Sequence, residues 1–227
     1  MLRIITFATQ KGGAGKTTLA TSFAVAAAEA GETVVLFDLD FQRSAMVWRE
    51  QRVLPKSASN PSPVTHPNNP IVEAYPADKV AQMAQMLRGL EKKGVTLVVL
   101  DTPGADNATV NAALAASDFA VILLAPTRID LGAVRPTVQA VMRTEAKFGF
   151  LLNNCPPQPN NPRAEKMATG LSALGPVAPV RIVRRADYQD AYADGKGVTE
   201  WAPGSPAAQE IRQLLEWVNE QTKGSIL

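Results

Sequence analysis

Five short apolar runs recur along the chain, and stretches with helical spacing separate them. The runs place β-branched or aromatic residues at consecutive positions, as do strands that are buried on both faces of a sheet. They span Leu2–Ala8, Thr33–Asp40, Val95–Asp101, Phe119–Pro126 and Phe148–Asn154. The helical stretches span residues 15–31, 44–54, 77–94, 107–117, 131–147 and 206–222.

Alternating strands and helices predict an α/β fold with a mainly parallel, twisted sheet and helices on both faces, because parallel strands need crossover connections. Two proline- and asparagine-rich stretches, Pro55–Pro70 and Asn153–Arg163, interrupt the alternation and are expected to form exposed loops. Neither is long enough to separate two domains. We therefore expect residues 1–227 to form a single domain.

Composition narrows the function classes without choosing one. Hydrophobic residues make up 46% of the 227 positions, which is enough for a sizeable core. The net charge of +2 is too close to zero to argue for nucleic acid or a membrane surface. A single cysteine, Cys155, excludes a disulfide framework and a cysteine-based metal site within one chain. No run approaches 18 apolar residues, and the N-terminus lacks an apolar signal segment, so we expect a cytoplasmic protein.

The stretch "FATQKGGAGKTTLA", Phe7–Ala20, places a glycine-rich turn between the first strand and the first helix. Glycines allow backbone N–H groups to converge on an anion, and the positive end of the helix dipole adds to them. Lys16 can reach terminal phosphates, and the Thr17 hydroxyl can ligate Mg²⁺. Gln10 occupies the first glycine position of the pattern G-x-x-x-x-G-K-[ST]. The alternative to a phosphate-binding loop is a flexible turn with a solvated lysine.

Carboxylates end two of the predicted strands. Asp38 and Asp40 lie two residues apart, hence on the same side of an ideal strand, and Asp101 follows four apolar residues. Carboxylates that face together resist joint ionisation unless a cation lies nearby, and carboxylate oxygens suit Mg²⁺. The alternatives are helix caps, with Asp40 starting the helix over 44–54 and Asp101 capping the helix that follows it.

The segment "QKGGAGKTT" resembles the deviant Walker A sequence, KGG-x-GK-[TS], of the ParA/MinD ATPases, whose members often lack the first glycine. The resemblance covers nearly the whole chain and implies a P-loop NTPase fold, ATP and Mg²⁺ as cofactors, and hydrolysis of ATP to ADP and phosphate. It identifies Lys11 as a signature lysine that reaches the phosphates of the other subunit's ATP in a dimer. This role is that of an arginine finger, which supplies charge in trans.

The resemblance also implies roles for single residues. Asp38 would hold the Mg²⁺ shell together with Thr17 and Asp101, and Asp40 would position the attacking water, so that Lys11, Lys16 and Asp40 are catalytic. Phe41 replaces the proline of the family's D-x-D-P-Q motif, which puts the geometry of this turn in question. The residues expected to contact the nucleotide in the loop are Lys11, Gly12, Gly13, Ala14, Gly15, Lys16, Thr17 and Thr18.

Three further residues are expected to contact the base. An asparagine near the end of the last strand contacts adenine in the resembling proteins, and an amide offers the donor and acceptor that adenine's edge requires. We therefore assign Asn154 to adenine, the alternative being an ordinary turn asparagine. Pro179 and Arg181 lie in a late segment that resembles the family's, and they are expected to line the base.

The resemblance further implies a homodimer that forms on ATP binding and a dimer that binds DNA without sequence preference. Arg184 and Arg185 form a tight basic cluster and are the expected DNA contacts, the alternative being ordinary solvated arginines. A ParB-type or adaptor protein would stimulate hydrolysis. The expected function is the partitioning or positioning of DNA or another large cargo, with the protein on the nucleoid when ATP is bound.

Three other functions are weaker alternatives. A MinD-like ATPase would act on a membrane surface through a basic amphipathic C-terminal helix. The segment "LLEWVNEQTKGSIL" has one lysine and two glutamates, so no membrane binding is expected. A metabolic ligase of the same superfamily would need a dedicated substrate pocket, and the sequence shows no residues that require one. The last alternative is a scaffold that binds nucleotide without hydrolysing it, and the presence of Lys11, Lys16, Asp38, Asp40 and Asp101 argues against it.

Overall fold

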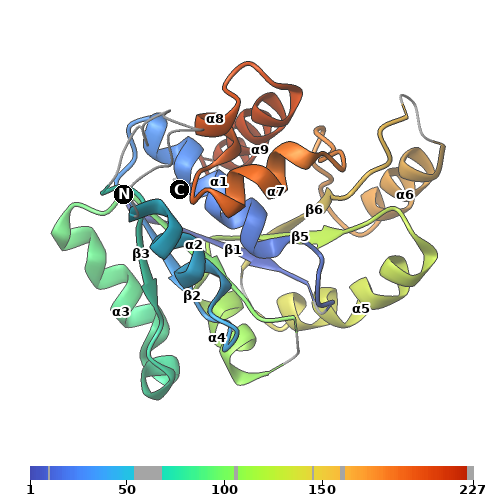
Figure 1. The fold of residues 1–227 in the computed structure, drawn as a ribbon. Helices are drawn as coiled ribbons and strands as arrows, with labels where there is room; N and C mark the ends of the chain where they lie inside the picture. The colour runs from blue at the N-terminus through green and yellow to red at the C-terminus, as the bar shows by residue number, and fades with distance from the viewer. Residues whose placement is uncertain (10, 54–67, 105–106, 145, 159–161, 224–227) are drawn as a thin grey trace.

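A parallel β-sheet forms the centre of the computed structural model, which describes residues 1–9, 11–53, 68–104, 107–144, 146–158 and 162–223 (Figure 1). Within these residues the sheet has six strands in the order β3-β2-β4-β1-β5-β6. Every paired neighbour is parallel. The strands are β1 (Arg3–Ala8), β2 (Val34–Asp38), β3 (Ile71–Ala74), β4 (Leu97–Asp101), β5 (Phe119–Leu124) and β6 (Lys147–Leu152).

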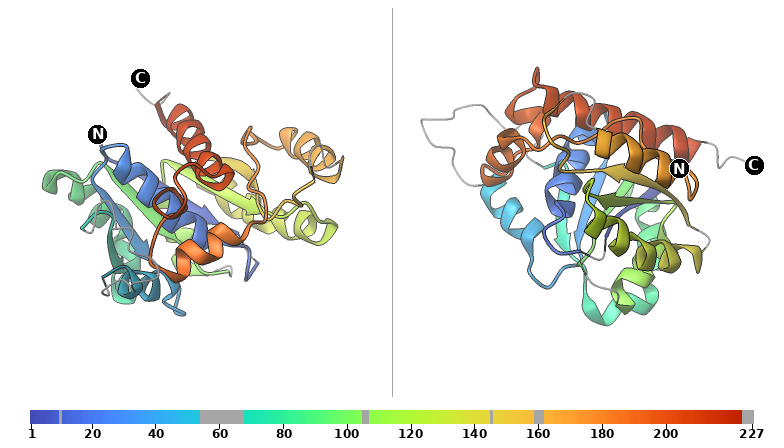
Figure 2. Two further views of the ribbon diagram at one scale, coloured as in Figure 1. Left: turned by 45° about the horizontal axis from the view of Figure 1, so that its top comes forward. Right: turned by 90° about the vertical axis from the view of Figure 1, so that its right-hand side faces the viewer.

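Helices cover both faces of the sheet, as the two views of Figure 2 show. One face packs against α1 (Lys16–Glu29), α2 (Ser44–Val53), α7 (Ala186–Ala193), α8 (Val198–Trp201) and α9 (Pro206–Lys223). The other face packs against α3 (Met83–Gly89), α4 (Ala108–Ala116), α5 (Arg128–Met142) and α6 (Pro162–Ser172). The predicted α/β fold, with a parallel sheet between two helical layers, is therefore confirmed.

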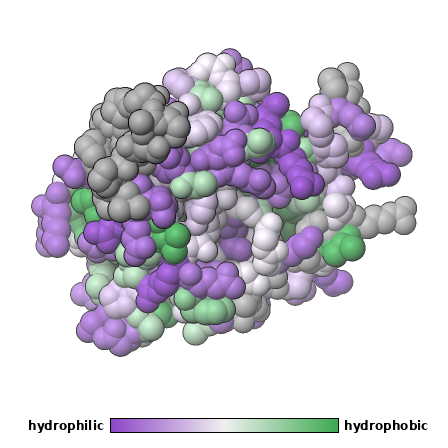
Figure 3. All heavy atoms as spheres, viewed as in Figure 1, coloured by the Kyte–Doolittle hydropathy of each residue, from purple (hydrophilic) through white to green (hydrophobic). Residues whose placement is uncertain are grey.

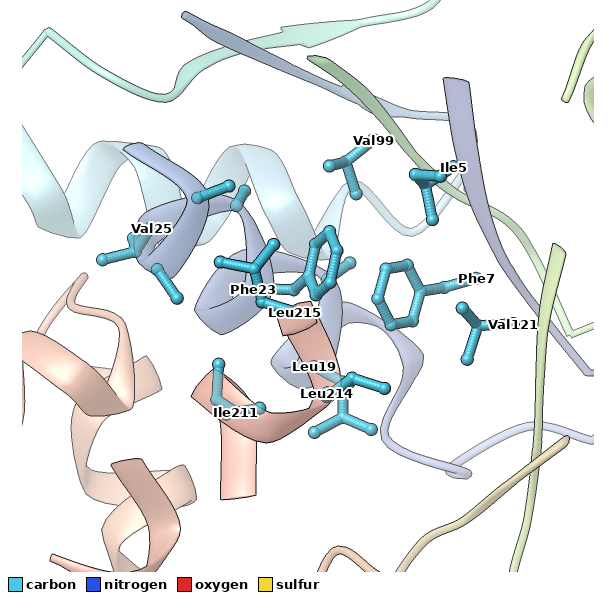
Figure 4. Packing of buried hydrophobic residues seen from close by; sticks show 14 of the residues in the cluster. Ile5, Phe7, Leu19, Phe23, Val25, Val99, Val121, Ile211, Leu214 and Leu215 are labelled. Carbon is cyan, nitrogen blue, oxygen red and sulfur yellow. The ribbon is translucent and has the colours of Figure 1, made fainter. Parts of the chain in front are cut away.

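The core on the α1 side shows why α1 keeps a fixed position beneath the phosphate loop. Phe7 of β1 and Phe23 of α1 meet edge to face, with ring centroids 5.3 Å apart. Leu19, Leu214 and Leu215 surround this pair, so α1 lies between the sheet and α9 (Figure 4). Burying a side chain of this size contributes about 1.5–3 kcal/mol, and α1 is therefore held by packing along most of its length.

The strand β3 was not predicted from the sequence. It has only four residues and lies at the edge of the sheet beside β2, with Val35 opposite Ile71. Ile71 is half-exposed, so β3 lacks the continuous apolar run of a central strand. The predicted loop Pro55–Pro70 lies mostly outside the described residues, and Asn69 holds its described end by accepting a hydrogen bond from the Val34 amide at 3.0 Å.

The predicted helix over residues 77–94 is divided. It consists of the 3₁₀ turn Ala77–Gln82, then α3, then a second 3₁₀ turn over Leu90–Lys93. The helices α6, α7 and α8 were not predicted; α6 begins at Pro162, inside a stretch that the sequence indicated as loop. None of the described helices combines the length and apolarity needed to cross a membrane. The face in Figure 3 is mainly hydrophilic, with scattered hydrophobic patches.

Candidate nucleotide-binding site

The glycine-rich loop joins β1 to α1 at the carboxyl end of a central strand. Gly13 and Gly15 have φ angles of 72° and 83°, in the left-handed region that glycine adopts without steric cost. A Cβ atom on Gly15 would also lie 2.8 Å from Nδ2 of Asn153. Because α1 begins at Lys16, its first backbone N–H groups, which have no partner within the helix, adjoin the loop. The loop therefore has the geometry of an anion-binding site.

Lys16 is largely buried at the start of α1. Burial lowers the pKa of its ammonium group, while the negative charges of Asp101 and Asp40 act in the opposite direction. The Nζ atom donates to the backbone oxygen of Lys11 at 3.4 Å. The lysine is thus held within the loop, close to the two carboxylates.

Asp101 is the most unusual group in the site. It ends β4, is 0% exposed, and neither of its carboxylate oxygens has a hydrogen-bond partner among the described residues. Burial raises the pKa of Asp101 to about 7; the charges of Asp38 and Asp40 add to the rise, whereas the Thr17 hydroxyl and Lys16 oppose it. A buried carboxylate without partners is costly unless a cation or proton compensates it.

Asp38 lies directly opposite Asp101 in the register between β2 and β4. Its two carboxylate oxygens accept hydrogen bonds from the backbone amides of Asp40 at 3.0 Å and Met46 at 3.1 Å. Burial raises the pKa of Asp38, and these amide donors oppose the rise. Asp38 is therefore the residue that caps the start of α2, while a carboxylate still has lone pairs left for a cation.

Asp40 does not cap α2. Its Oδ1 accepts from the Gln42 amide at 3.0 Å, inside a turn that Arg43 closes with a left-handed φ of 56°. Asp101 is not a cap either, because Asn107 caps α4 by accepting from the Val110 amide at 2.9 Å. The helix-cap alternatives for Asp40 and Asp101 therefore do not explain why these carboxylates are present.

The oxygen donors of this corner fit Mg²⁺ bound together with nucleotide phosphates. Asp101 supplies a fully buried carboxylate whose oxygens have no hydrogen-bond partner among the described residues, and Asp38 and the Thr17 hydroxyl lie beside it. Oxygen ligands of this kind suit Mg²⁺, which usually takes one or two carboxylates and a hydroxyl from the protein and the rest from water and phosphate.

The segment after β4 packs directly on the glycine-rich loop. A Cβ atom on Gly104 would lie 3.0 Å from the backbone nitrogen of Gly12 and 3.1 Å from the carbonyl carbon of Lys11. Thr102 donates to the backbone oxygen of Phe7 at 2.8 Å. The end of β4 and the loop after β1 are thus packed against each other through their backbones.

A cleft of about 780 Å³ opens over this corner and extends to the β6 side of the sheet. The β2 side is formed by the turn 38–44, together with Tyr75 and Val80. The β6 side is formed by Asn154 and the segment 182–185, and three residues of α7, Tyr188, Gln189 and Tyr192, complete the lining. The volume suits a ligand of nucleotide size.

Most of the residues predicted to bind nucleotide meet in this cleft. Its lining includes Gly12, Gly13, Ala14, Gly15, Lys16, Thr17, Thr18, Asp38, Asp40, Asn154, Arg184 and Arg185. Asp101 is buried beneath the lining, and Lys11 is exposed beside it. Pro179 and Arg181 do not line the cleft within the described part of the chain; Ile182 and Val183 occupy that wall instead.

Two functional candidates were missed by the sequence analysis. Asn153 is buried and its Nδ2 donates to the backbone oxygen of Ala14 at 2.6 Å, so it ties the end of β6 to the loop. Tyr192 donates to the backbone oxygen of Ser44 at 2.7 Å and joins α7 to the start of α2. The pair Asn153–Asn154 was visible in the sequence, but the pattern could not tell which amide faces the loop.

The fold and the loop together define the class: a P-loop nucleotide-binding protein. The profile of the family CbiA, the CobQ/CobB/MinD/ParA nucleotide binding domain, matches residues 5–198. The chain belongs to this family, and the predicted resemblance to the ParA/MinD ATPases is confirmed.

Two differently named curated proteins are similar in sequence to this chain. The maintenance of carboxysome distribution protein A of Halothiobacillus neapolitanus is 30% identical over 216 residues, which cover 92% of each chain. Protein virC1 of Rhizobium radiobacter is 32% identical over 131 residues, which are 57% of this chain and 52% of that protein. This chain therefore matches about half of the length of virC1.

Solved structures share the fold at low identity. The septum site-determining protein MinD of Pyrococcus horikoshii, solved with Mg-ADP, matches with a TM-score of 0.73 and 17% identity over 97% of both chains. A putative plasmid partition protein of Borrelia burgdorferi, bound to AMPPNP, matches with a TM-score of 0.73 and 17% identity over 97% of this chain and 100% of the other. At this identity the likeness establishes the fold.

Proposed function

We propose that this chain is an ATP hydrolase that dimerises on ATP and positions a large cargo. The observation that supports this most is Asp101, a fully buried carboxylate without a hydrogen-bond partner among the described residues, placed below Lys16 and Thr17. Such a group suits a site that a magnesium–nucleotide complex completes. The relatives named for carboxysome distribution and plasmid partition support the cargo class.

Each residue of the site then has a distinct task. The amides of residues 12–18 and the Lys16 ammonium bind the phosphates, and Thr17, Asp38 and Asp101 hold Mg²⁺. When bound, Mg²⁺ neutralises the charge that develops on the phosphoryl group. Asp40 orients the attacking water from the turn before α2. Lys11, exposed beside the cleft, supplies charge to the other subunit's nucleotide in trans.

Binding to DNA is the part of the proposal that links the dimer to its cargo. Arg184 is exposed at the rim of the cleft, whereas Arg185 is half-buried and pairs with Glu210 at 3.0 Å. We expect Arg184 to contribute more of the phosphate contact than Arg185. A ParB-type or adaptor protein then stimulates hydrolysis, and the protein is cytoplasmic and associates with the nucleoid in its ATP form.

The nucleotide part of the proposal is tested by calorimetry with ATP and Mg²⁺ and by the oligomeric state. Lys16→Ala should abolish nucleotide binding, because the terminal phosphates lose their buried cation. Lys11→Ala should retain ATP binding but lose dimer formation and hydrolysis, measured by light scattering and phosphate release. A Lys11→Ala variant that still dimerises on ATP contradicts the role in trans, and a wild-type protein that takes up no adenine nucleotide contradicts the function itself.

The DNA part is tested by charge reversal. Arg184→Glu should weaken binding to random-sequence DNA and lower the slope of log K against log salt by about 1, because one phosphate contact is lost. Lys93→Glu is the matched control, since Lys93 is exposed before the start of β4, whereas the cleft lies at the carboxyl ends of the strands. Equal losses for both variants would show that overall charge, and not this site, binds DNA.

A further inference from the structure

The β6 side of the cleft is a wall formed by a segment that lies outside the regular strands. This wall, defined here as residues 182–188, follows the end of β6 through three backbone hydrogen bonds. The Ile182 amide donates to the Leu152 oxygen at 2.9 Å. The Cys155 amide donates to the Ile182 oxygen at 3.0 Å, and the Arg184 amide donates to the Cys155 oxygen at 2.9 Å. Beyond Arg184 the described bonds of this kind end, and the wall needs another anchor.

That anchor is Glu210, which projects from α9 and is largely buried. Its Oε2 accepts from the Val183 amide at 3.2 Å and from the Tyr188 hydroxyl at 2.9 Å. Its Oε1 accepts from Nε and Nη2 of Arg185 at 3.1 and 3.0 Å. One carboxylate thus receives four hydrogen bonds from three residues of the wall, and charge-assisted bonds of this kind are the stronger ones.

The two side chains that bind Glu210, Tyr188 and Arg185, act as hydrogen-bond donors. Burial raises the pKa of Tyr188, and the neighbouring charge of Glu210 raises it further, so the phenol remains a donor. The Arg185 guanidinium has only N–H donors and no acceptor, so it can only donate to the carboxylate. Glu210 is therefore a fixed acceptor that gives the wall a single position relative to α9.

The place of the wall indicates which part of a nucleotide it meets. The loop that would hold the phosphates follows β1, and the carboxylates Asp38 and Asp101 lie on its β2–β4 side. The wall lies beside β6, two strands from β1 on the other side, which is roughly 10 Å at the usual strand spacing. The cleft extends from the loop to this wall, so a nucleotide whose phosphates occupy the loop and whose Mg²⁺ lies at the carboxylates has room for its nucleoside beside the wall.

We propose that Glu210 is a positioning residue that sets the affinity for the nucleoside part of the nucleotide by fixing Val183, Arg185 and Tyr188 on the wall of the cleft. This inference rests on the proposed binding of ATP and adds to it a residue that lies outside the cleft lining. Glu210 does not touch the phosphates, so the phosphate loop keeps its own affinity when Glu210 is changed.

The test compares two ligands that differ only in the nucleoside. Affinities for ATP and for inorganic tripolyphosphate, each with Mg²⁺, are measured by calorimetry for wild type and for Glu210→Gln. The glutamine keeps the shape but loses the charge, so ATP binding should weaken about tenfold, the range of one charged hydrogen bond, while tripolyphosphate binding stays unchanged. In steady-state hydrolysis KM for ATP should rise while kcat at saturation stays near the wild-type value.

Glu216→Gln is the matched control, because Glu216 lies on the same helix and is exposed. It should leave both affinities unchanged. Tyr188→Phe removes one bond to Glu210 without removing the buried charge, and should weaken ATP binding about threefold with tripolyphosphate unaffected. This second variant decides the question if Glu210→Gln does not fold.

The outcomes separate this inference from the proposed function. Unchanged ATP affinity in Glu210→Gln, or an equal loss for ATP and tripolyphosphate, overturns the positioning role while leaving the ATPase proposal intact. A wild-type protein that binds neither ligand overturns both. Loss confined to ATP, absent from Glu216→Gln, supports the inference.

Discussion

Two buried carboxylates, Asp101 and Glu200, show how differently one fold treats the same chemical group. Glu200 receives a double hydrogen bond from Arg52, at 2.7 and 2.9 Å, and a third from the Gly197 amide at 3.1 Å. Asp101 is equally deep in the protein but has no such partner among the described residues. The comparison indicates that the Glu200 charge is compensated by residues of the fold, whereas the Asp101 site suits a ligand that supplies positive charge.

The residues around the Glu200 and Asp101 carboxylates differ in the same way. Around Glu200, Trp48 donates to the backbone oxygen of Lys196 at 3.1 Å and the Arg52 guanidinium stacks on the Trp48 ring at 5.1 Å. Close to Asp101 lies the ammonium group of Lys16, whose pKa burial lowers. The paired charges of Arg52 and Glu200 hold α2 and α8 together, whereas Asp101 lies where a ligand can compensate its charge.

The largest expected effect comes from breaking the buried ion pair between Arg52 and Glu200. Arg52→Ala leaves the Glu200 carboxylate buried without its cation and should lower the free energy of unfolding by about 3–5 kcal/mol, measured by urea denaturation. Arg88→Ala is the control, since its ion pair with Asp118 is partly exposed and should contribute only about 1 kcal/mol or less. Equal losses for the two variants would remove the distinction between buried and surface pairs.

The second-largest expected effect is an increase in the free energy of unfolding. Asp101→Asn removes an uncompensated charge, so the free energy of unfolding of the nucleotide-free protein should rise by about 2 kcal/mol at pH 8, while binding of the magnesium–nucleotide complex is lost. Asp190→Asn, an exposed substitution, should change neither quantity. A destabilised Asp101→Asn protein would show that the carboxylate is compensated within the fold.

The same group gives a dependence on pH. Burial raises the pKa of Asp101 to about 7, above its unfolded value of about 3.9, so the folded state holds the proton over a wider range than the unfolded state. Its contribution to stability is therefore full below about pH 4 and is lost as pH rises toward 7. The difference in unfolding free energy between wild type and Asp101→Asn should grow across this window.

The smallest effect concerns the contact between the two backbones of the site. Gly104→Ala places a methyl group 3.0 Å from the Gly12 nitrogen, so the loop must shift by a few tenths of an ångström. We expect a loss of about 1 kcal/mol in stability and weaker ATP binding, seen by thermal melts and calorimetry. Gly170→Ala is the control: it lies in α6 with open space around it and should be neutral or slightly stabilising.

The sequence by itself determined the strands β1, β2, β4, β5 and β6, the glycine-rich loop and the family. These follow from local information: a strand buried on both faces must be apolar at consecutive positions, and a phosphate loop needs glycines and a lysine at fixed offsets. The four-residue edge strand β3 and the helices α6, α7 and α8 escaped prediction, because their stability comes from neighbours that are distant in sequence.

Only the tertiary structure decided which polar groups meet. The sequence offered two adjacent asparagines, and the end of β6 turned Asn153 toward the loop and left Asn154 exposed in the cleft. It offered two aspartates at strand ends, Asp38 and Asp101. Backbone amides at the start of α2 bind Asp38, whereas the carboxylate oxygens of Asp101 have no hydrogen-bond partner among the described residues. Glu210 could not be found at all from its surroundings on α9, because its partners lie 22 to 27 residues earlier. A local pattern fixes which residues are apolar or can turn, but the compensation of a buried charge depends on which backbones the sheet brings within 3 Å of it.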